Sequence, residues 1–286
     1  MKKTLFITLL SCFIFTNSFA QTSVWKVTNK KGNTIYIGGT VHLLSPKDYP
    51  LPKEFNIAYN NSELLAIEAD IDQLENPAIA QKMMGKIMYQ DERTLSTVLN
   101  KPIYEMLKKE CAKFNLPLAN LEKLKPSMVI VTLTGMKMKA SGITSEGVDK
   151  HFLDKAKKDK KGVLFLESVD SQLNLLATMG DGNENNFVKK SLTELSETET
   201  LMDGLISDWR KGEKKVMGKQ IKEMKRDYPK LHKDLLVNRN NNWMPLIDNY
   251  LSTKKTELVL MGALHLHGKD GVLNLLKKKG YKLKQL

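Results

Sequence analysis

Long hydrophobic runs are missing from this sequence. No apolar stretch reaches the roughly 20 residues that a membrane-spanning helix needs, so we expect no transmembrane segment. The longest run, residues 5–15, follows two lysines and precedes a small-x-small pattern at residues 18–20. This order is typical of an export signal that is cut after Ala20. We therefore expect a signal peptide over residues 1–20 and a mature protein that is periplasmic or secreted.

Cysteine is nearly absent as well, because only Cys12 and Cys111 occur. Cys12 lies in "LLSC", which resembles a lipoprotein cleavage box. Cleavage there would leave only a handful of apolar residues in the signal, so lipoprotein anchoring through Cys12 is the less favoured alternative. With one cysteine left, the mature chain has no internal disulfide and depends on its hydrophobic core. The mature chain of about 265 residues is long enough to form such a core.

Arginine is scarce, since the chain has only four and lysine supplies most of the net charge of +13. A nucleic-acid site would place arginine and aromatic residues on one face. The short lysine clusters at residues 157–161 and 276–280 are typical of solvated helix ends. We predict no nucleic-acid partner.

Motifs that would identify an enzyme at once are also missing. The sequence has no HExxH zinc motif, phosphate-binding loop, GxSxG elbow, EF-hand loop or Cys-x-x-Cys pair. Low-complexity segments and short-period repeats are absent too. Function must therefore be argued from residues that the fold brings together.

What the sequence does contain is an alternation of strand-like and helix-like segments. Two strand-like segments flank "KKGN" and predict an antiparallel hairpin, whereas the later ones are separated by helices and predict parallel crossovers. The apolar runs at residues 63–68 and 162–168 indicate strands buried on both faces. The strand-like segments are residues 24–29, 34–39, 63–68, 162–168, 257–265 and 281–286.

Helical periodicity fills two long insertions, at about residues 76–140 and 171–251. The second insertion contains Pro229 and Pro245, which we expect in the first turns of helices. The predicted fold class is α/β, with a mixed, mostly parallel central sheet covered by helices and with the insertions forming a helical cap. We expect a single domain over residues 21–286.

Two Gly-x-x-His motifs follow predicted strands at opposite ends of the chain. "IGGTVH" ends at His42 and "GALH" ends at His265, while Glu68 and Glu167 end two further strands. Ligands bind at the carboxyl edge of such sheets, so we expect the four side chains to share a cleft. The glycine before each histidine allows a sharp turn or a close approach to the backbone.

Each of these residues also has a structural interpretation. A strand-end histidine can be satisfied by ordinary hydrogen bonds, and a buried carboxylate can pair with lysine or arginine. Arg239 in "NRNNNW" opens a predicted helix, where it could bind a carboxylate or an oxyanion, or simply pair with an acid. Asp149, in the first turn of a lysine-rich helix predicted from Ser145, has the same ambiguity.

The remaining histidines carry less weight. His267 lies beyond the second glycine motif and is at most a supporting residue. His151 and His232 lie in lysine-rich helical segments, and we assign them no role. Two histidines with a carboxylate suit a divalent metal ion with water at its open positions, or acid/base catalysis without a metal.

Six segments carry a resemblance to a known family. They are, in order, "YIGGTVHLLS", "LLAIEAD", "SEGVDKHFLDKA", "VLFLESVDSQL", "NRNNNW" and "LVLMGALHLHGKDGVLNLLKKKGY". On these segments the chain resembles the TraB/GumN/PrgY family, which includes the Tiki proteins. The resemblance implies a fold like that of the erythromycin-esterase and ChaN-type proteins, with the two Gly-x-x-His motifs facing each other across one cleft.

The resemblance also implies a function, because Tiki proteins are described as metalloproteases that clip secreted signals. His42 and His265 would be the paired histidines, Glu68 the acid and Arg239 the arginine of the cleft, while Asp149 and Glu167 match further family positions. PrgY is associated with blocking a peptide pheromone, and ChaN-type proteins with haem-iron binding.

The resulting hypothesis is an exported metal-dependent hydrolase that acts on a peptide or another small molecule. His42, His265 and Glu68 would hold the divalent ion, with manganese, cobalt or zinc as candidates, and Arg239 would stabilise the developing oxyanion. If Glu68 is not a ligand, it becomes the general base. A metal-free, esterase-like hydrolase and a non-catalytic peptide- or haem-binding protein remain the alternatives.

Overall fold

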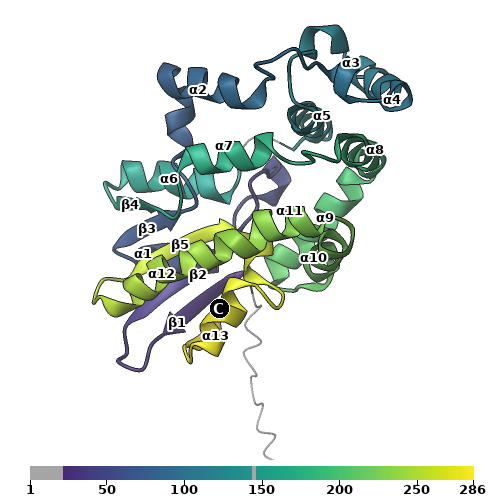
Figure 1. The fold of residues 1–286 in the computed structure, drawn as a ribbon. Helices are drawn as coiled ribbons and strands as arrows, with labels where there is room; N and C mark the ends of the chain where they lie inside the picture. Colours follow the sequence, from purple (N-terminus) through teal and green to yellow (C-terminus); the bar gives the residue numbers. More distant parts are fainter. Residues whose placement is uncertain (1–21, 144–145) are drawn as a thin grey trace, which may run out of the picture.

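A six-stranded mixed sheet forms the centre of the molecule (Figure 1). The computed structural model describes residues 22–143 and 146–286, so the predicted signal peptide lies outside the described residues. The strand order is β4-β3-β5-β2-β1-β6. The strands are β1 (Val24–Thr28), β2 (Thr34–Thr40), β3 (Leu64–Ile67), β4 (Gly162–Phe165), β5 (Glu257–Gly262) and β6 (Lys282–Gln285).

The four strands from β4 to β2 are parallel, whereas β1 is antiparallel to both of its neighbours, β2 and β6. β1 and β2 form the predicted hairpin, and Gly32 adopts a φ of +90° in its turn, a conformation that suits glycine. The predicted α/β class with a mostly parallel sheet is confirmed.

Burial along the strands follows their place in the sheet. β5 lies between β3 and β2, and its residues from Glu257 to Met261 are all buried. The prediction that residues 162–168 form a strand buried on both faces is wrong for β4. This strand lies at the edge with only β3 beside it, and Phe165 is 38% exposed. Its apolar sequence did not distinguish an edge strand from a central one.

Helices cover the sheet and extend beyond it (Figure 1). The α-helices are α1 (Lys53–Asn60), α2 (Pro77–Ile87), α3 (Leu95–Val98), α4 (Lys101–Ala112), α5 (Pro126–Ala140), α6 (Val148–Lys158), α7 (Val169–Ala177), α8 (Glu184–Leu195), α9 (Thr198–Lys211), α10 (Lys215–Asp227), α11 (Pro229–His232), α12 (Arg239–Ser252) and α13 (Val272–Lys278). The short 3₁₀ turns are η1 (Pro46–Asp48), η2 (Ile71–Glu75), η3 (Leu118–Leu121) and η5 (Ala263–Leu266), and η4 (Lys233–Asn238) is a π-helix.

Alternating residues of the strands build a separate core on each face of the sheet. Leu65 of β3 packs on one face with Phe55 of α1, Phe152 of α6 and Trp209 of α9. Ala66, the next residue of β3, packs on the other face with side chains of α12 and α13. Both faces are therefore closed by helices, as parallel strands require.

The helical insertions form a cap with a core of its own. α3, α4, α5 and α8 bury their apolar side chains against one another, and Figure 1 shows these helices together, away from the sheet. α2 packs on α7 through a small apolar cluster. The prediction of a helical cap is confirmed.

α11, η4 and α12 follow one another without a break and form one long helical segment. Arg239 therefore follows a π-helix and does not open a free helix. Pro229 is the first residue of α11, as predicted, but Pro245 lies inside α12, so that prediction is wrong. Proline cannot donate a backbone hydrogen bond, so one bond of the helix is lost at Pro245. The helix continues because Trp243, Met244 and Ile247, on both sides of the proline, pack into the core.

None of the helices within residues 22–143 and 146–286 is both long enough and apolar enough to cross a lipid bilayer.

Candidate functional site

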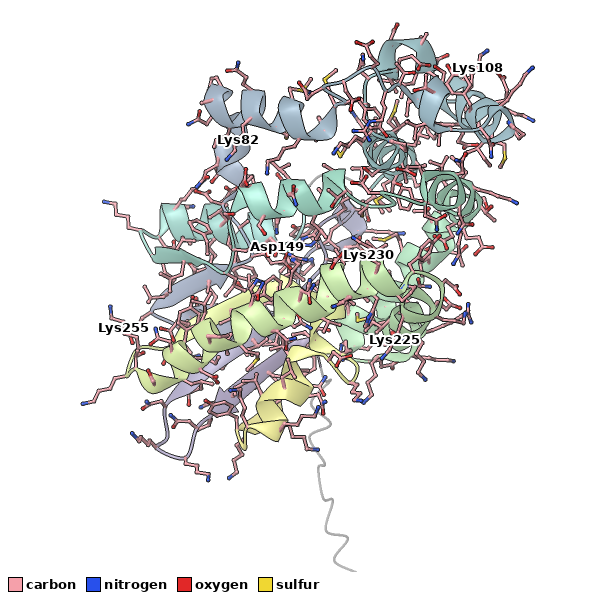
Figure 2. All side chains as sticks on the ribbon, in the orientation of Figure 1. Lys82, Lys108, Asp149, Lys225, Lys230 and Lys255 are labelled. Carbon is pink, nitrogen blue, oxygen red and sulfur yellow. The ribbon has the colours of Figure 1, made fainter. Side chains whose placement is uncertain are left out.

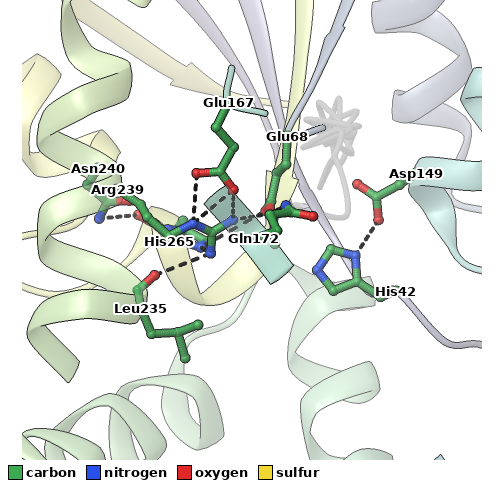
Figure 3. A network of polar contacts seen from close by, with 10 residues as sticks. His42, Glu68, Asp149, Glu167, Gln172, Leu235, Arg239, Asn240 and His265 are labelled. Atoms are coloured by element: carbon green, nitrogen blue, oxygen red, sulfur yellow. Dashed lines mark hydrogen bonds and ion pairs between the residues drawn. The ribbon is translucent and has the colours of Figure 1, made fainter. Parts of the chain in front are cut away.

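The carboxyl ends of four parallel strands meet at one edge of the sheet. His42 comes two residues after β2, Glu68 directly after β3, Glu167 two residues after β4 and His265 three residues after β5. Because these strands are neighbours in parallel register, their ends lie side by side. Figure 3 shows the four side chains, with Arg239 and Asp149, in one small region. The structure thus brings together residues from both ends of the chain.

The Arg239 guanidinium lies at the centre of a buried network (Figure 3). Its Nε donates to both oxygens of Glu167 at 3.1 Å, and its Nη2 donates to Glu167 at 2.7 Å and to Glu68 at 2.5 Å. Its Nη1 donates to the Leu235 carbonyl at 3.3 Å and to His265 Nε2 at 2.9 Å. A guanidinium has five N–H groups. All of them are engaged by the protein.

His265 is held as a neutral ring with a defined tautomer. Because Arg239 can only donate, His265 Nε2 accepts, and the proton is on Nδ1. Nδ1–H donates to Asn240 Oδ1 at 2.7 Å, and the Trp243 ring lies 4.5 Å away between ring centroids. Burial lowers the pKa of His265 to about 3, so the ring carries no charge at neutral pH.

Glu68 is a buried carboxylate that stays ionised. Burial alone would raise its pKa, but nearby positive charge, including that of Arg239, and a hydrogen bond from the Gly262 N–H at 2.6 Å lower it to about 2. Gln172 Nε2 also donates to Glu68, at 3.2 Å. Such a carboxylate accepts hydrogen bonds well but takes up a proton poorly.

His42 has the opposite surroundings. Its Nδ1 lies 2.7 Å from Asp149 Oδ2, and its side chain is 62% exposed whereas that of Asp149 is 14% exposed. The Asp149 charge raises the pKa of His42 to about 9. The ring is an imidazolium at neutral pH, and within the described residues its Nε2 has no hydrogen-bond partner.

A glycine at the start of α6 makes the pairing of His42 with Asp149 feasible. The Val148 N–H donates to the Val41 carbonyl at 3.1 Å, which fixes the first turn of α6 against the chain after β2. A Cβ on Gly147 would overlap the carbonyl oxygen of His42. Only glycine therefore allows this close contact, which places Asp149 beside the ring.

The glycines of the two Gly-x-x-His motifs allow neighbouring side chains to lie close to the backbone and are not needed for a turn. A Cβ on Gly262 would lie 3.3 Å from Glu68 Oε1, 3.4 Å from His42 Nε2 and 3.6 Å from His265 Cδ2. Both imidazoles and the carboxylate therefore surround one short piece of backbone. At Gly39 a Cβ would come within 2.7 Å of Leu266, so β2 and η5 pack without space for a side chain.

These residues line a cavity of about 410 Å³. Its polar wall contains His42, Glu68, Asp149, Lys150, Gln172 and Arg239. The apolar wall is formed by Ile67, Ala69, Ile71, Leu175, Leu176 and Leu235. The volume is within the range of small-molecule and peptide side-chain sites. Carboxylates (Asp149, Glu68 and Glu167) and cations (Arg239, protonated His42 and Lys150, the last paired with Asp154) are mixed around this cavity.

His267 does not join this site. Its ring packs edge-on against Trp25 at 5.9 Å between centroids, and it lines a different hollow. His151 contacts Tyr49 and Phe152 instead.

Two contributors to the site were missed by the sequence reasoning. Gln172 bonds Glu68 from the first turns of α7, and Asn240 sets the tautomer of His265. Asn240 is adjacent to Arg239 in "NRNNNW", so that polar motif contained the signal. Gln172 lies five residues after Glu167. Its position soon after the end of a strand was the one sequence signal that placed it near the site.

The residues fit the predicted three-ligand metal site only in part. Among the described residues, no three His, Cys, Asp or Glu side chains are arranged as ligands of one metal ion. His265 Nε2 accepts from Arg239, and Glu68 Oε2 accepts from the same guanidinium. His42 Nε2 has no partner within the described residues, and Glu68 Oε1 accepts only from the Gly262 N–H, so each of these two predicted ligands keeps a lone pair for an ion.

Fold and site together define a class of protein. It is an α/β protein in which two Gly-x-x-His motifs and buried carboxylates surround an arginine at the carboxyl edge of the sheet. The model of the TraB/PrgY/gumN family matches residues 23–285, nearly the whole chain, and the chain belongs to this family. Searches of curated proteins and of solved structures gave no match.

Proposed function

We propose that this chain is a hydrolase that cleaves an amide C–N bond in a peptide, with His42 as the residue that transfers protons. One observation carries the proposal. Of the two motif histidines, His42 alone has a ring nitrogen free to face the cavity, while Asp149 holds its other nitrogen. His265 has both nitrogens engaged.

The arrangement suits general-base catalysis. The reactive form is the His42 ring that has lost its proton, which becomes the major form above its pKa of about 9. Asp149 then holds the remaining proton on Nδ1, which leaves Nε2 as the base. A water molecule that enters between Nε2 and Glu68 Oε1 gives a proton to Nε2 while its oxygen attacks the carbonyl carbon. Asp149 stabilises the imidazolium that forms, and this imidazolium then passes the proton to the leaving amine. Glu68, with its low pKa, orients the water and does not take the proton.

Arg239 acts here as a positioning residue. Its N–H groups hold Glu68, Glu167 and His265 in place, so none is left to contact a developing oxyanion. Its charge keeps Glu68 ionised in a buried place. The predicted oxyanion role for Arg239 would require one of these bonds to break.

The charge and lining of the cavity support a peptide as the substrate. The apolar wall from η2, α7 and η4 suits an uncharged side chain. The carboxylates of the polar wall can accept hydrogen bonds from a positively charged group, such as the terminal ammonium of a peptide. From the leader-like residues 1–20, we further propose that the protein acts after export.

A divalent metal ion is the second candidate, and the pair of His42 and Glu68 favours it. His42 and Glu68 would hold the ion, because His42 Nε2 and Glu68 Oε1 face the same point beside Gly262. When bound, such an ion supplies a more acidic water molecule and a polarised carbonyl. His265 could join only after Arg239 released it.

Digestion of a peptide library, read by mass spectrometry, tests both candidates. The protein is purified without a histidine tag and assayed as purified, after complete chelation, and with manganese, cobalt or zinc added. We expect cleavage to survive chelation and to fall by about 10²-fold or more in His42→Ala, since general-base catalysis contributes that much. His151→Ala, a histidine variant outside the site, is the control and should cleave normally.

The other outcomes are equally informative. Cleavage that is lost on chelation and restored by one metal would favour the second candidate. Peptides that bind but stay intact in every arm would overturn the hydrolase and leave a sequestering protein.

A further inference from the structure

A second hollow lies behind the candidate site. Leu235 and Arg239 line the cavity described above, whereas His232, Leu236 and Asn240 line a hollow of about 810 Å³. Residues spaced by four lie on the same side of a helix. The helical segment from α11 to α12 therefore separates the two spaces, and the side chains of α10 form the opposite wall of the hollow.

Four lysines surround this hollow without a counterion. Lys214, Lys222 and Lys225 belong to the start and one face of α10, and Lys269 lies in the turn after η5. Within the described residues, none of the four forms an ion pair, and Asp270 is the one acid that lines the hollow. Some lysines elsewhere are paired, as Lys230 is with Asp234 at 2.8 Å, whereas here four lysines that are unpaired among the residues the structure describes border one hollow. The uncompensated positive charge favours an anion in this place.

Two histidines of the hollow lack hydrogen-bond partners. His232 is only 6% exposed, and no hydrogen bond of its ring occurs within the part of the chain that the structure describes. The Nε2 atom of His267 is buried and has no partner either. Buried polar groups nearly always have a partner, so the unpartnered Nε2 atom of His267, in a ring that lines the hollow, indicates a ligand that supplies it.

We propose that this basic hollow binds a phosphate group. A phosphate carries two negative charges and several acceptor oxygens, which match lysine ammonium groups and imidazole N–H donors. The group could belong to a free phosphorylated molecule or to a lipid headgroup, and the chemistry is the same. This site is independent of the hydrolase proposal, because its test measures binding and not cleavage.

Calorimetric titration of the mature chain with inorganic pyrophosphate tests the proposal. We expect saturable binding that Lys222→Gln/Lys225→Gln weakens by about tenfold or more, since charge-assisted contacts are lost. Lys254→Gln/Lys255→Gln removes the same charge from the chain after α12. In Figure 2, Lys255 and Lys225 lie on opposite sides of the molecule, so this control should bind like the wild type. Equal weakening in both variants would show unspecific attraction and overturn the proposal.

Two further measurements locate the ligand and its source. Pyrophosphate should shift the ring resonances of His232 and His267 and leave those of His151 unchanged. Vesicles of phosphatidylcholine, with and without phosphatidic acid, form the second arm. Binding of pyrophosphate alone assigns a free ligand, and binding of the phosphatidic-acid vesicles alone assigns a lipid headgroup. Binding of neither, or binding without the shifts at His232 and His267, refutes the site.

Discussion

At the scale of single residues, two histidines in matching motifs have opposite protonation states. Asp149 raises the pKa of His42 to about 9, whereas burial lowers that of His265 to about 3. The main cause is a charged partner for His42 and burial for His265. His42 faces a carboxylate, and His265 accepts from a guanidinium. The two motifs therefore supply a ring that exchanges protons and a ring that fixes its neighbours.

Replacing Asp149 by Asn should separate these effects. The His42 pKa is expected to fall from about 9 toward its ordinary value of 6.5, because the main cause of the increase is removed. The rate of a hydrolysis that needs the neutral ring increases as the pH rises through the His42 pKa. In Asp149→Asn this increase should therefore occur at lower pH. The maximal rate should fall because the ring is no longer oriented.

NMR titration of the His42 ring and a pH–rate profile measure the two shifts. Asp154→Asn, in the same helix but paired with Lys150 at the surface, is the matched control. A His42 pKa that does not change in Asp149→Asn would contradict the assigned role of the carboxylate.

At the scale of elements, the site depends on close contacts between strand ends and helix starts. β2 and β5 deliver the histidines, and α6 docks its first turn against the chain after β2. The π-helix η4 directly precedes Arg239, and Leu235 within it accepts from the guanidinium. π-helical turns are rare and occur often at functional sites. Here η4 sets the position from which Arg239 reaches both glutamates.

Gly147→Ala tests the docking of α6. The added methyl group would overlap the His42 carbonyl, so the first turn of α6 must move and Asp149 must leave His42. We expect a lower His42 pKa and a lower melting temperature, measured by NMR titration and by calorimetry. Gly135→Ala is the control, because a Cβ there meets no atom within 4 Å. It lies inside α5, where alanine should stabilise by about 0.5–1 kcal/mol. Equal behaviour of the two variants would exclude the proposed contact.

At the scale of the whole molecule, the buried histidines make stability depend on pH. Burial lowers the pKa of His265 to about 3 and that of His267 to about 4. The unfolded chain therefore binds protons below about pH 6.5 that the folded chain does not bind. His42 acts in the other direction. Its raised pKa adds stability that is complete below about pH 6.5 and is lost as the pH rises through about 9.

The free energy of unfolding should accordingly be highest near pH 6.5 and fall on both sides. Urea denaturation at a series of pH values measures it, and each buried histidine should contribute a slope of about 1.4 kcal/mol per pH unit on the acid side. His267→Gln should remove one such slope without touching the candidate site. An acid-side slope that is the same in His267→Gln as in the wild type would refute the neutral state of the His267 ring.

Much of the fold could be predicted from local pattern alone. Apolar runs separated by helical periodicity specify parallel crossovers, and the "KKGN" turn specifies the hairpin. The placement of His42, Glu68, Glu167 and His265 at strand ends followed from the same pattern, because parallel strands share one carboxyl edge.

Other features could not be read locally, because they depend on contacts between distant segments. β4 is apolar like β3, yet only the strand order makes it an edge. Pro245 lies inside a helix because the core holds α12 on both sides of it. The sequence could not show that Arg239 donates a hydrogen bond to His265 Nε2. This bond removes His265 from the predicted metal ligands.

The sequence by itself determined which residues stand where strands end and therefore which side chains can meet. Tertiary structure alone decided their chemical states, since the pKa of His42, the tautomer of His265 and the charge of Glu68 depend on partners from other parts of the chain. The physical reason is that a strand end is fixed by local periodicity, whereas burial and Coulomb interactions act through space between segments that only folding brings together.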